Sequence, residues 1–188
     1  MGKIVLMMSV SLDGFMETED RDIGWGRVDE ELHSDLNQVV RGMRGLLSGR
    51  VTHELMARYW PTADADPGAS PAVAEFAGIW RSLPKTVYSR TLRSAGWNTT
   101  VVHEVVPEEV AALRDAAPGD LALGGADLAD TFLRHDLVDE FRILVHPVLL
   151  GRGRPLFRSP REEQRDLDLV ATRTYGNGVV LLHHARRR

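Results

Sequence analysis

The hydrophobic positions along the chain follow two different periods. Short apolar runs, typical of buried strands, alternate with longer stretches whose apolar residues lie three or four positions apart, as on one face of a helix. The first run predicts a strand over residues 3–12, and the next stretch predicts a helix over residues 29–44. The same two patterns predict strands over residues 45–48, 85–89, 97–103, 120–123 and 138–146, and helices over residues 51–59, 72–81, 107–116 and 126–135. Strands that alternate with helices favour a mainly parallel sheet covered by helices.

The last part of the chain departs from this alternation. Two strand-like stretches, residues 168–175 and 179–185, flank the turn sequence Gly-Asn-Gly. This is a strong hairpin signal, and it predicts an antiparallel pair at one edge of the sheet. Residues 61–71 are rich in Pro, Ala, Asp and Gly, which indicates a loop, either a plain surface excursion or a lid over a site. With 188 residues and no internal repeat, we expect a single domain over residues 1–188.

Composition and charge narrow the possible partners. The formal net charge is −4, which argues against a nucleic-acid partner. The chain has no cysteine, which excludes disulfides, thiolate metal sites and cysteine nucleophiles, and fits the cytoplasmic location that we expect. The apolar residues 4–8 are too few to span a membrane and are not followed by a signal-peptide cleavage pattern, so we expect no membrane association.

Several standard chemistries lack their motifs. The sequence contains no G-x-G-x-x-G fingerprint, no phosphate-binding Walker loop and no G-x-S-x-G nucleophile turn. The adjacent residues His183 and His184 point to opposite faces of a predicted strand and cannot hold one metal together. We therefore expect no metal site, and we interpret these histidines as solvated or lying at the edge of the core.

The strongest local signal is the sequence Gly124-Gly125-Ala126, which lies between a predicted strand and a predicted helix. Residues without a Cβ let the backbone approach a ligand, and the free N–H groups of a helix start favour an anion. A tight turn with no ligand explains the same residues equally well.

Two further strand ends carry similar residues. At the first, Gly49-Arg50-Val51-Thr52 offers a guanidinium for a phosphate, although Thr52 could simply cap the helix. At the second, Ser89-Arg90 suits a phosphate monoester. If the strands are parallel, all three junctions lie at the carboxyl edge of the sheet, where open α/β folds bind ligands. Their convergence predicts one ligand with several phosphates.

Four segments resemble, in order, the motifs of the reductase domain found in bacterial riboflavin biosynthesis, a dihydrofolate-reductase-like family. These are Ser-Leu-Asp-Gly-Phe at 11–15, Leu-Leu-Ser-Gly-Arg-Val-Thr-His-Glu at 46–54, residues 85–92, and residues 124–157 with Pro-Val-Leu-Leu-Gly-Arg-Gly at 147–153. The resemblance implies a dihydrofolate-reductase-like α/β fold, with a mainly parallel central sheet, flanking helices and the C-terminal antiparallel hairpin. It also implies NADPH as cofactor and, as is frequent in the family, a homodimer.

The resemblance gives the three junctions specific roles. Ser89 and Arg90 would flank the 2′-phosphate of the adenosine and so favour NADPH over NADH. The remaining junction residues would contact the other phosphates, the pyrophosphate above all; they are Gly49, Arg50, Thr52, Gly124, Gly125 and Ala126. The implied reaction is hydride transfer to a small molecule resembling a pteridine, a folate or a ribosylamino-pyrimidine.

The substrate side is less defined by the motifs. Asp13 and Asp29 are the candidate proton donors, with Glu30 and Glu31 competing for the second position, and Trp25 and Trp60 are candidate pocket walls. Each has a structural alternative: an Asp-Gly turn, the acidic start of a helix, or core packing. Two other interpretations of the whole chain stay open, a non-catalytic nucleotide-binding protein of the same fold and a module whose last strands only build a dimer.

Overall fold

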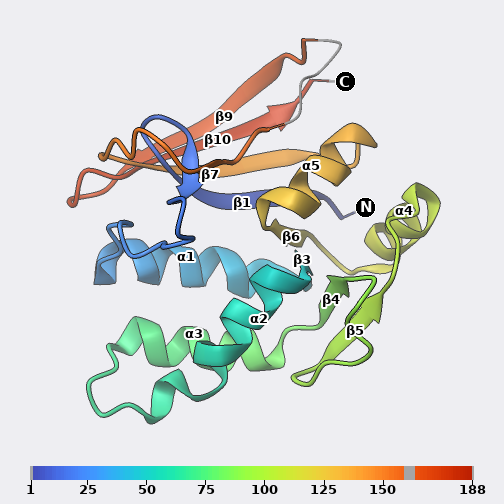
Figure 1. Ribbon diagram of the computed structural model, residues 1–188, viewed down its shortest axis with the longest axis horizontal. Coiled ribbons are helices and arrows are strands. Elements are labelled where there is room, and N and C mark those ends of the chain that lie inside the picture. Colours follow the sequence, from blue (N-terminus) through green and yellow to red (C-terminus); the bar gives the residue numbers. More distant parts are fainter. Residues whose placement is uncertain (1, 159–163, 188) are drawn as a thin grey trace.

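The computed structural model describes residues 2–158 and 164–187, and its main feature is an eight-stranded sheet with helices on both faces (Figure 1). The strand order is β5-β4-β3-β6-β1-β7-β10-β9. The strands are β1 (Ile4–Ser11), β3 (Gly45–Gly49), β4 (Lys85–Tyr88), β5 (Thr99–Val102), β6 (Leu121–Gly124), β7 (Glu140–His146), β9 (Leu167–Thr174) and β10 (Val180–Arg186). The helices are α1 (Glu30–Gly42), α2 (Arg50–Tyr59), α3 (Pro71–Ser82), α4 (Pro107–Ala116) and α5 (Ala126–Arg134).

The predicted fold class is confirmed. The strands from β5 to β7 run parallel, while β10 pairs antiparallel with both β7 and β9. In Figure 1 this C-terminal hairpin extends along the upper edge of the sheet. The strand predicted over residues 97–103 begins only at Thr99, because Trp97 and Asn98 adopt positive φ angles of 62° and 56° that no strand residue has.

The order of the strands explains which helices cover which face. From β1 through β3 and β4 to β5 the chain moves toward one edge, and from β5 through β6 to β7 it moves back. Because parallel crossovers are right-handed, the two directions place their helices on opposite faces of the sheet. Accordingly α1, with α3 packed against it, covers one face, and α4 and α5 cover the other.

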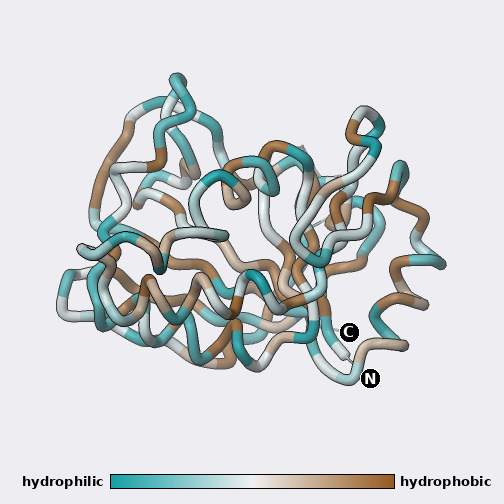
Figure 2. Tube along the Cα trace, turned by 90° about the horizontal axis from the view of Figure 1, so that it is seen from below, coloured by the Kyte–Doolittle hydropathy of each residue, from teal (hydrophilic) through white to brown (hydrophobic). Residues whose placement is uncertain are grey.

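The core lies on both faces of the central strand β1, as its continuous apolar run predicts. Ile4 and Leu6 pack toward Phe132 of α5, while Val5, on the opposite face, packs against Met43 after α1. Figure 2 shows the resulting pattern, with apolar segments in the interior and polar positions alternating along the outer helices. Burial on both faces makes β1 a rigid support for whatever lies at its carboxyl end.

Two short elements of the structure are not predicted from the sequence. The predicted loop over residues 61–71 overlaps a 3₁₀ helix, η1 (Trp60–Ala65), whose second residue is a proline. A separate two-stranded sheet joins β2 (Phe15–Glu17) to β8 (Arg154–Pro155). Elements this short have no detectable periodicity, and their pairing joins segments that are far apart in the sequence. Among the described residues, no helix is both long and apolar enough to cross a bilayer.

A cluster of ionisable side chains lies near the start of β7, with Glu140 and His183 buried and Lys3 half exposed. Glu140 accepts a hydrogen bond from Lys3, and its second oxygen lies 2.8 Å from His183 Nε2. His183 is therefore buried beside Glu140, which agrees with the core-edge alternative rather than the solvated one. Among the described residues, no group of three or more His, Cys, Asp or Glu side chains could hold a metal ion. Burial opposes the ionisation of Glu140, but the hydrogen bonds from Lys3 and His183 outweigh it and hold the pKa of this carboxyl below its ordinary value of 4.5.

This cluster should make stability depend on pH. A carboxyl whose pKa is lowered by folding stabilises the native state above its unfolded pKa, and this stabilisation is lost as the pH falls through the folded pKa. Glu140→Gln cannot titrate, so the difference in unfolding free energy between the native protein and this variant should shrink below about pH 4.5. Urea denaturation at several pH values measures it. Glu108→Gln, on the exposed surface of α4, is the control, and a difference for Glu140→Gln that stays constant with pH would contradict the assignment.

Candidate functional site

A cavity of about 870 Å³ opens at the carboxyl edge of the parallel strands. Its volume lies in the upper part of the range of roughly 300–1,000 Å³ typical of small-molecule sites. The lining residues come from the ends of β3, β4, β6 and β7, from the segments after β5 and β1, and from β1 itself. The strands from β5 to β7 are five spacings apart, or roughly 24 Å. The cavity is therefore a long groove across the sheet edge.

Two helices begin at the middle of this groove without side-chain caps. Gly49 is the N-cap of α2 and Gly125 the N-cap of α5, and neither glycine has a side chain that could cap its helix. In contrast, Asp29 caps α1 and Ser70 caps α3 through their side chains. The possible capping role of Thr52 is thus wrong, because that residue lies inside α2. Uncapped helix starts leave N–H groups that bind an anion.

The two helix starts meet at Gly125. Its φ is +92°, and a Cβ built on it would lie 2.5 Å from Thr52 Oγ1. Its N–H donates to Met8 Sδ over 3.1 Å, and a thioether is only a weak acceptor. A stronger acceptor such as a phosphate oxygen could therefore take the place of the sulfur at this N–H group.

Basic and hydroxyl side chains line the end of the groove beside β4 and β5. The Ser89 hydroxyl accepts hydrogen bonds from the N–H groups of Thr91 and Leu92, and the Ser89 carbonyl accepts one from His103 Nδ1 over 3.0 Å. Arg90 lines the cavity, is exposed and has no charged partner in the described part of the chain. Arg50 is held by Glu54 one turn further along α2, at 2.8 Å. This end of the groove suits a further phosphate group.

The opposite end of the groove is built around His146, the last residue of β7. Its Nδ1 accepts a hydrogen bond of 2.9 Å from the N–H of Arg27, and its ring lies 5.4 Å from that of Trp25 in an edge-to-face arrangement. Burial, reinforced by the charge of Arg27, lowers the pKa of His146 below its ordinary value, so the ring is neutral at neutral pH. The sequence analysis missed this residue, although its position at a strand end satisfies the same rule that pointed to the three junctions.

A second polar group lies beside β1, β2 and β8. Arg154 contacts Asp127 at 2.6 Å and Glu17 at 3.2 Å, and Arg158 also pairs with Asp127. The side chain of Arg154 is 24% exposed and that of Glu17 is 10% exposed. The charges of Arg154 and Glu17 therefore largely neutralise each other in this wall of the groove.

Most of the predicted site residues lie together in this one groove. The structure brings into its lining Gly49, Arg50, Thr52, Ser89, Arg90, Gly125, Ala126 and Trp25. Gly124 is the last residue of β6, directly before Gly125, but does not itself line the cavity. These residues come from four separate segments, and the parallel sheet is what gathers them.

The two carboxylates considered as proton donors lie elsewhere. Asp13 accepts hydrogen bonds from the N–H groups of Gly151 (2.7 Å) and Leu150 (3.2 Å) and from the hydroxyl of Ser11 (2.6 Å). The hydrogen bond from Ser11 holds the pKa of Asp13 below its ordinary value, the opposite of what a general acid requires. Asp29 caps α1 by accepting from the N–H of Leu32. Both carboxylates organise backbone, and neither lines the cavity.

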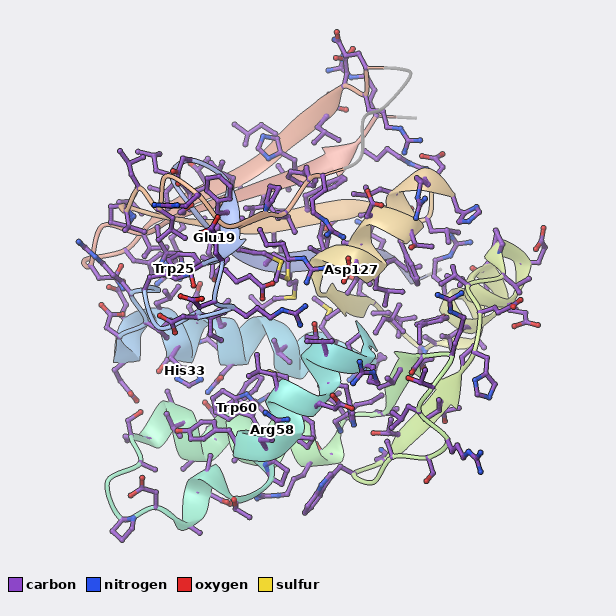
Figure 3. All side chains as sticks on the ribbon, in the orientation of Figure 1. Glu19, Trp25, His33, Arg58, Trp60 and Asp127 are labelled. Atoms are coloured by element: carbon purple, nitrogen blue, oxygen red, sulfur yellow. The ribbon has the colours of Figure 1, made fainter. Side chains whose placement is uncertain are left out.

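Trp60 also lies outside the groove. Its ring lies 4.4 Å from that of Phe76 and 5.7 Å from that of His33, in an aromatic cluster between α1, α2 and α3. Figure 3 shows Trp25 above α1 and Trp60 below it. Trp60 is thus a half-buried member of this ring cluster and does not line the cavity, while Trp25 does.

Comparison with known proteins identifies the family of the chain. The model of the RibD C-terminal domain matches residues 2–181. The chain belongs to the RibD C-terminal domain family. Two relatives from Bacillus subtilis, both uncharacterised, are YyaP, 35% identical over 97% of this chain and 94% of that protein, and YwjB, 31% identical over 98% of each.

Three solved structures have the same fold as this chain. A putative riboflavin biosynthesis protein from Shewanella sp. PV-4 matches with a TM-score of 0.76, 21% identity and 99% coverage of both chains. A pyrimidine reductase-like protein from Corynebacterium diphtheriae matches with a TM-score of 0.63, 15% identity and coverage of 100% and 92%. A deaminase/reductase from Thermotoga maritima matches with a TM-score of 0.67 and 13% identity over 99% of this chain but only 57% of that longer chain. At these identities the likeness supports the fold alone.

The close approach at Gly125 predicts a steep cost for a side chain there. Gly125→Ala places a Cβ against Thr52 and forces a non-glycine residue into a positive φ, so it should destabilise the protein by about 1–3 kcal/mol. Gly124→Ala is the matched control, because a Cβ there meets nothing within 4 Å. Urea denaturation compares the two variants, and equal stability of both would show that the contact with Thr52 is not a constraint.

Proposed function

We propose that the groove binds NADPH and that the protein is an NADPH-dependent reductase of a small molecule. The observation that carries this proposal is the meeting of two helix starts without side-chain caps at Gly125, in the same groove as Arg90, which has no charged partner among the described residues. One extended ligand with a pyrophosphate in its middle and a further phosphate at one end fits this spacing of donors. The names of the solved relatives, which include a pyrimidine reductase-like protein, support the same class of reaction.

The positions of the hydrogen-bond donors along the groove imply an orientation for the bound cofactor. The pyrophosphate would accept hydrogen bonds from the starts of α2 and α5, close to Thr52 and Gly125. The adenosine with its 2′-phosphate would lie toward Ser89, Arg90 and His103. The nicotinamide end would then extend toward β1, leaving the part of the groove near His146 for the molecule that is reduced.

In this proposal the residues of the chain bind and position the cofactor and the substrate, and the bound cofactor supplies the hydride. The hydride would add to the carbon of a C=N or C=O bond, and the nitrogen or oxygen would take a proton from water. No carboxylate is required as acid, which agrees with the placement of Asp13 and Asp29 outside the cavity. The groove would hold the two molecules side by side, so that the acceptor carbon lies within reach of the transferred hydride.

A non-catalytic nucleotide-binding protein is the alternative. The space near Trp25 and His146, beyond the residues assigned to the cofactor, favours the enzyme because a binding protein does not need it. Calorimetry with NADPH and NADH tests the cofactor, and loss of NADPH absorbance in the presence of pterin, folate and pyrimidine acceptors tests the reaction. Absence of NADPH binding would overturn the proposal, whereas binding without turnover on any acceptor would favour the alternative.

The choice between the two cofactors should depend on Arg90. Arg90→Ala should raise the Kd for NADPH about tenfold, because it removes a charge-assisted contact with the 2′-phosphate, and should change the Kd for NADH by less than about twofold. Fluorescence titration of both cofactors measures the effect. Arg93→Ala, an exposed arginine outside the groove, is the control. Equal losses for NADPH and NADH would exclude the 2′-phosphate role.

A further inference from the structure

His146 presents a buried hydrogen-bond donor at the end of the groove. Its side chain is fully buried, and its Nδ1 accepts from the N–H of Arg27, so the neutral ring carries its proton on Nε2. That Nε2–H has no hydrogen-bond partner among the described residues. The indole Nε1–H of Trp25 is likewise buried without a partner in this part of the chain. Two unpaired buried donors thus occur on two side chains that pack together and line the cavity.

Such a pair calls for an explanation, because buried donors in native proteins are almost always satisfied. Leaving a donor unpaired is costly, and a ligand that brings an acceptor to it recovers that cost on binding. A carbonyl oxygen or a ring nitrogen is an acceptor of suitable size. The position of His146 at the carboxyl end of β7, next to β1, places the donor beyond the proposed cofactor site.

The charged and apolar side chains around this end of the groove indicate the chemistry of the rest of the ligand. Arg154, which lines this part of the cavity, is already paired with Glu17 and Asp127. The rim carries exposed apolar side chains from the segment before α1 and from α2; they are Ile23, Val28, Val51 and Leu55, which are 49%, 57%, 43% and 46% exposed. At this end of the groove Arg154 is the lining arginine among the described residues, and because it is already paired it would offer a phosphate little, while an apolar ring would cover the rim.

We propose that the substrate is an uncharged, planar molecule without a phosphate group, and that the Nε2–H of His146, next to the indole N–H of Trp25, binds its acceptor atom. This inference rests on the proposed function, because it assigns the second molecule in the same groove. His146 acts as a binding residue, and the proton of the reduced bond still comes from water.

The segment that covers the ring has to move slightly when the ligand binds. Gly26 lies over His146, where a Cβ would be 3.7 Å from Cε1. The segment is tied down by the N–H of Arg27 on His146 Nδ1 and by the Asn177 side chain, which donates to the Arg27 carbonyl over 3.2 Å. Both ties engage Nδ1 and the backbone of Arg27, so neither uses Nε2.

Two replacements of His146 separate its two nitrogen atoms. His146→Asn keeps an acceptor near the position of Nδ1 but has no group at Nε2, and His146→Gln places an amide N–H near Nε2. We expect His146→Asn to raise the Kd of hydroxymethyl-dihydropterin for the NADP⁺-loaded protein by about 10-fold or more, and His146→Gln to recover most of it. The Kd for NADPH should stay unchanged in both variants. Equal pterin affinity in the native protein and His146→Asn would overturn the proposal.

A second comparison tests the charge of the substrate. Hydroxymethyl-dihydropterin and its phosphate ester differ only in the phosphate, and we expect the ester to bind the NADP⁺-loaded protein about 10-fold more weakly or worse. Equal or tighter binding of the ester, or no binding of either pterin to a protein that binds NADPH, would overturn the inference and leave the cofactor role intact. If NADPH itself does not bind, both proposals fail.

Thermal melting of each variant establishes that it is folded. If His146→Asn is not folded, Trp25→Phe gives a related test, because it removes the indole N–H and keeps a smaller aromatic ring against His146. It should weaken the pterin without changing the Kd for NADPH. An unchanged pterin affinity in a folded Trp25→Phe variant would remove Trp25 from the site.

Discussion

The contact between Thr52 and Gly125 is the constraint on which the groove depends. Two neighbouring parallel strands, β3 and β6, end side by side, and the helices that follow them start within contact of each other. Only a residue without a Cβ, in a backbone conformation that other residues avoid, allows the hydroxyl of Thr52 to lie where it does. The free N–H groups of both helix starts consequently line the same cavity, and neither start is covered by a side-chain cap.

The groove is chemically different at its two ends. Toward β4 and β5 it carries an arginine with no charged partner in the described part of the chain and a serine whose hydroxyl already orders its own turn. Toward β7 its arginine is neutralised by two carboxylates, and its wall holds two donors that no other described group satisfies. One end is suited to a multiply charged ligand and the other to a neutral one. In the proposed function, charge alone would therefore direct the cofactor and the substrate to different ends of the groove.

Membership in the RibD C-terminal domain family defines the scaffold more firmly than the substrate. A fold supports many reactions, and the residues that decide among them lie on the segments at the carboxyl edge. In this chain those segments, between β1 and α1 and at the end of β7, supply Trp25 and His146. The carboxylate positions suggested by the resemblance serve instead to cap α1 and to order the segment after β7.

The sequence by itself determined the alternation of strands and helices, the C-terminal hairpin and the glycine junctions, because periodicity and turn residues act over a few neighbouring positions. It could not determine the partners of side chains that are distant along the chain. Asp13 and Trp60 are candidate site residues by sequence, each with a structural alternative, and the structure shows that Asp13 binds backbone 137 and 138 positions away and that Trp60 packs between helices. The position of His146 at the end of a predicted strand is a weak local signal, but its hydrogen bond with Arg27 and its ring contact with Trp25 arise only when the tertiary structure brings these residues together from opposite ends of the chain. Burial and hydrogen bonding between remote segments are decided only when the sheet assembles, and these interactions separate a ligand contact from a structural one.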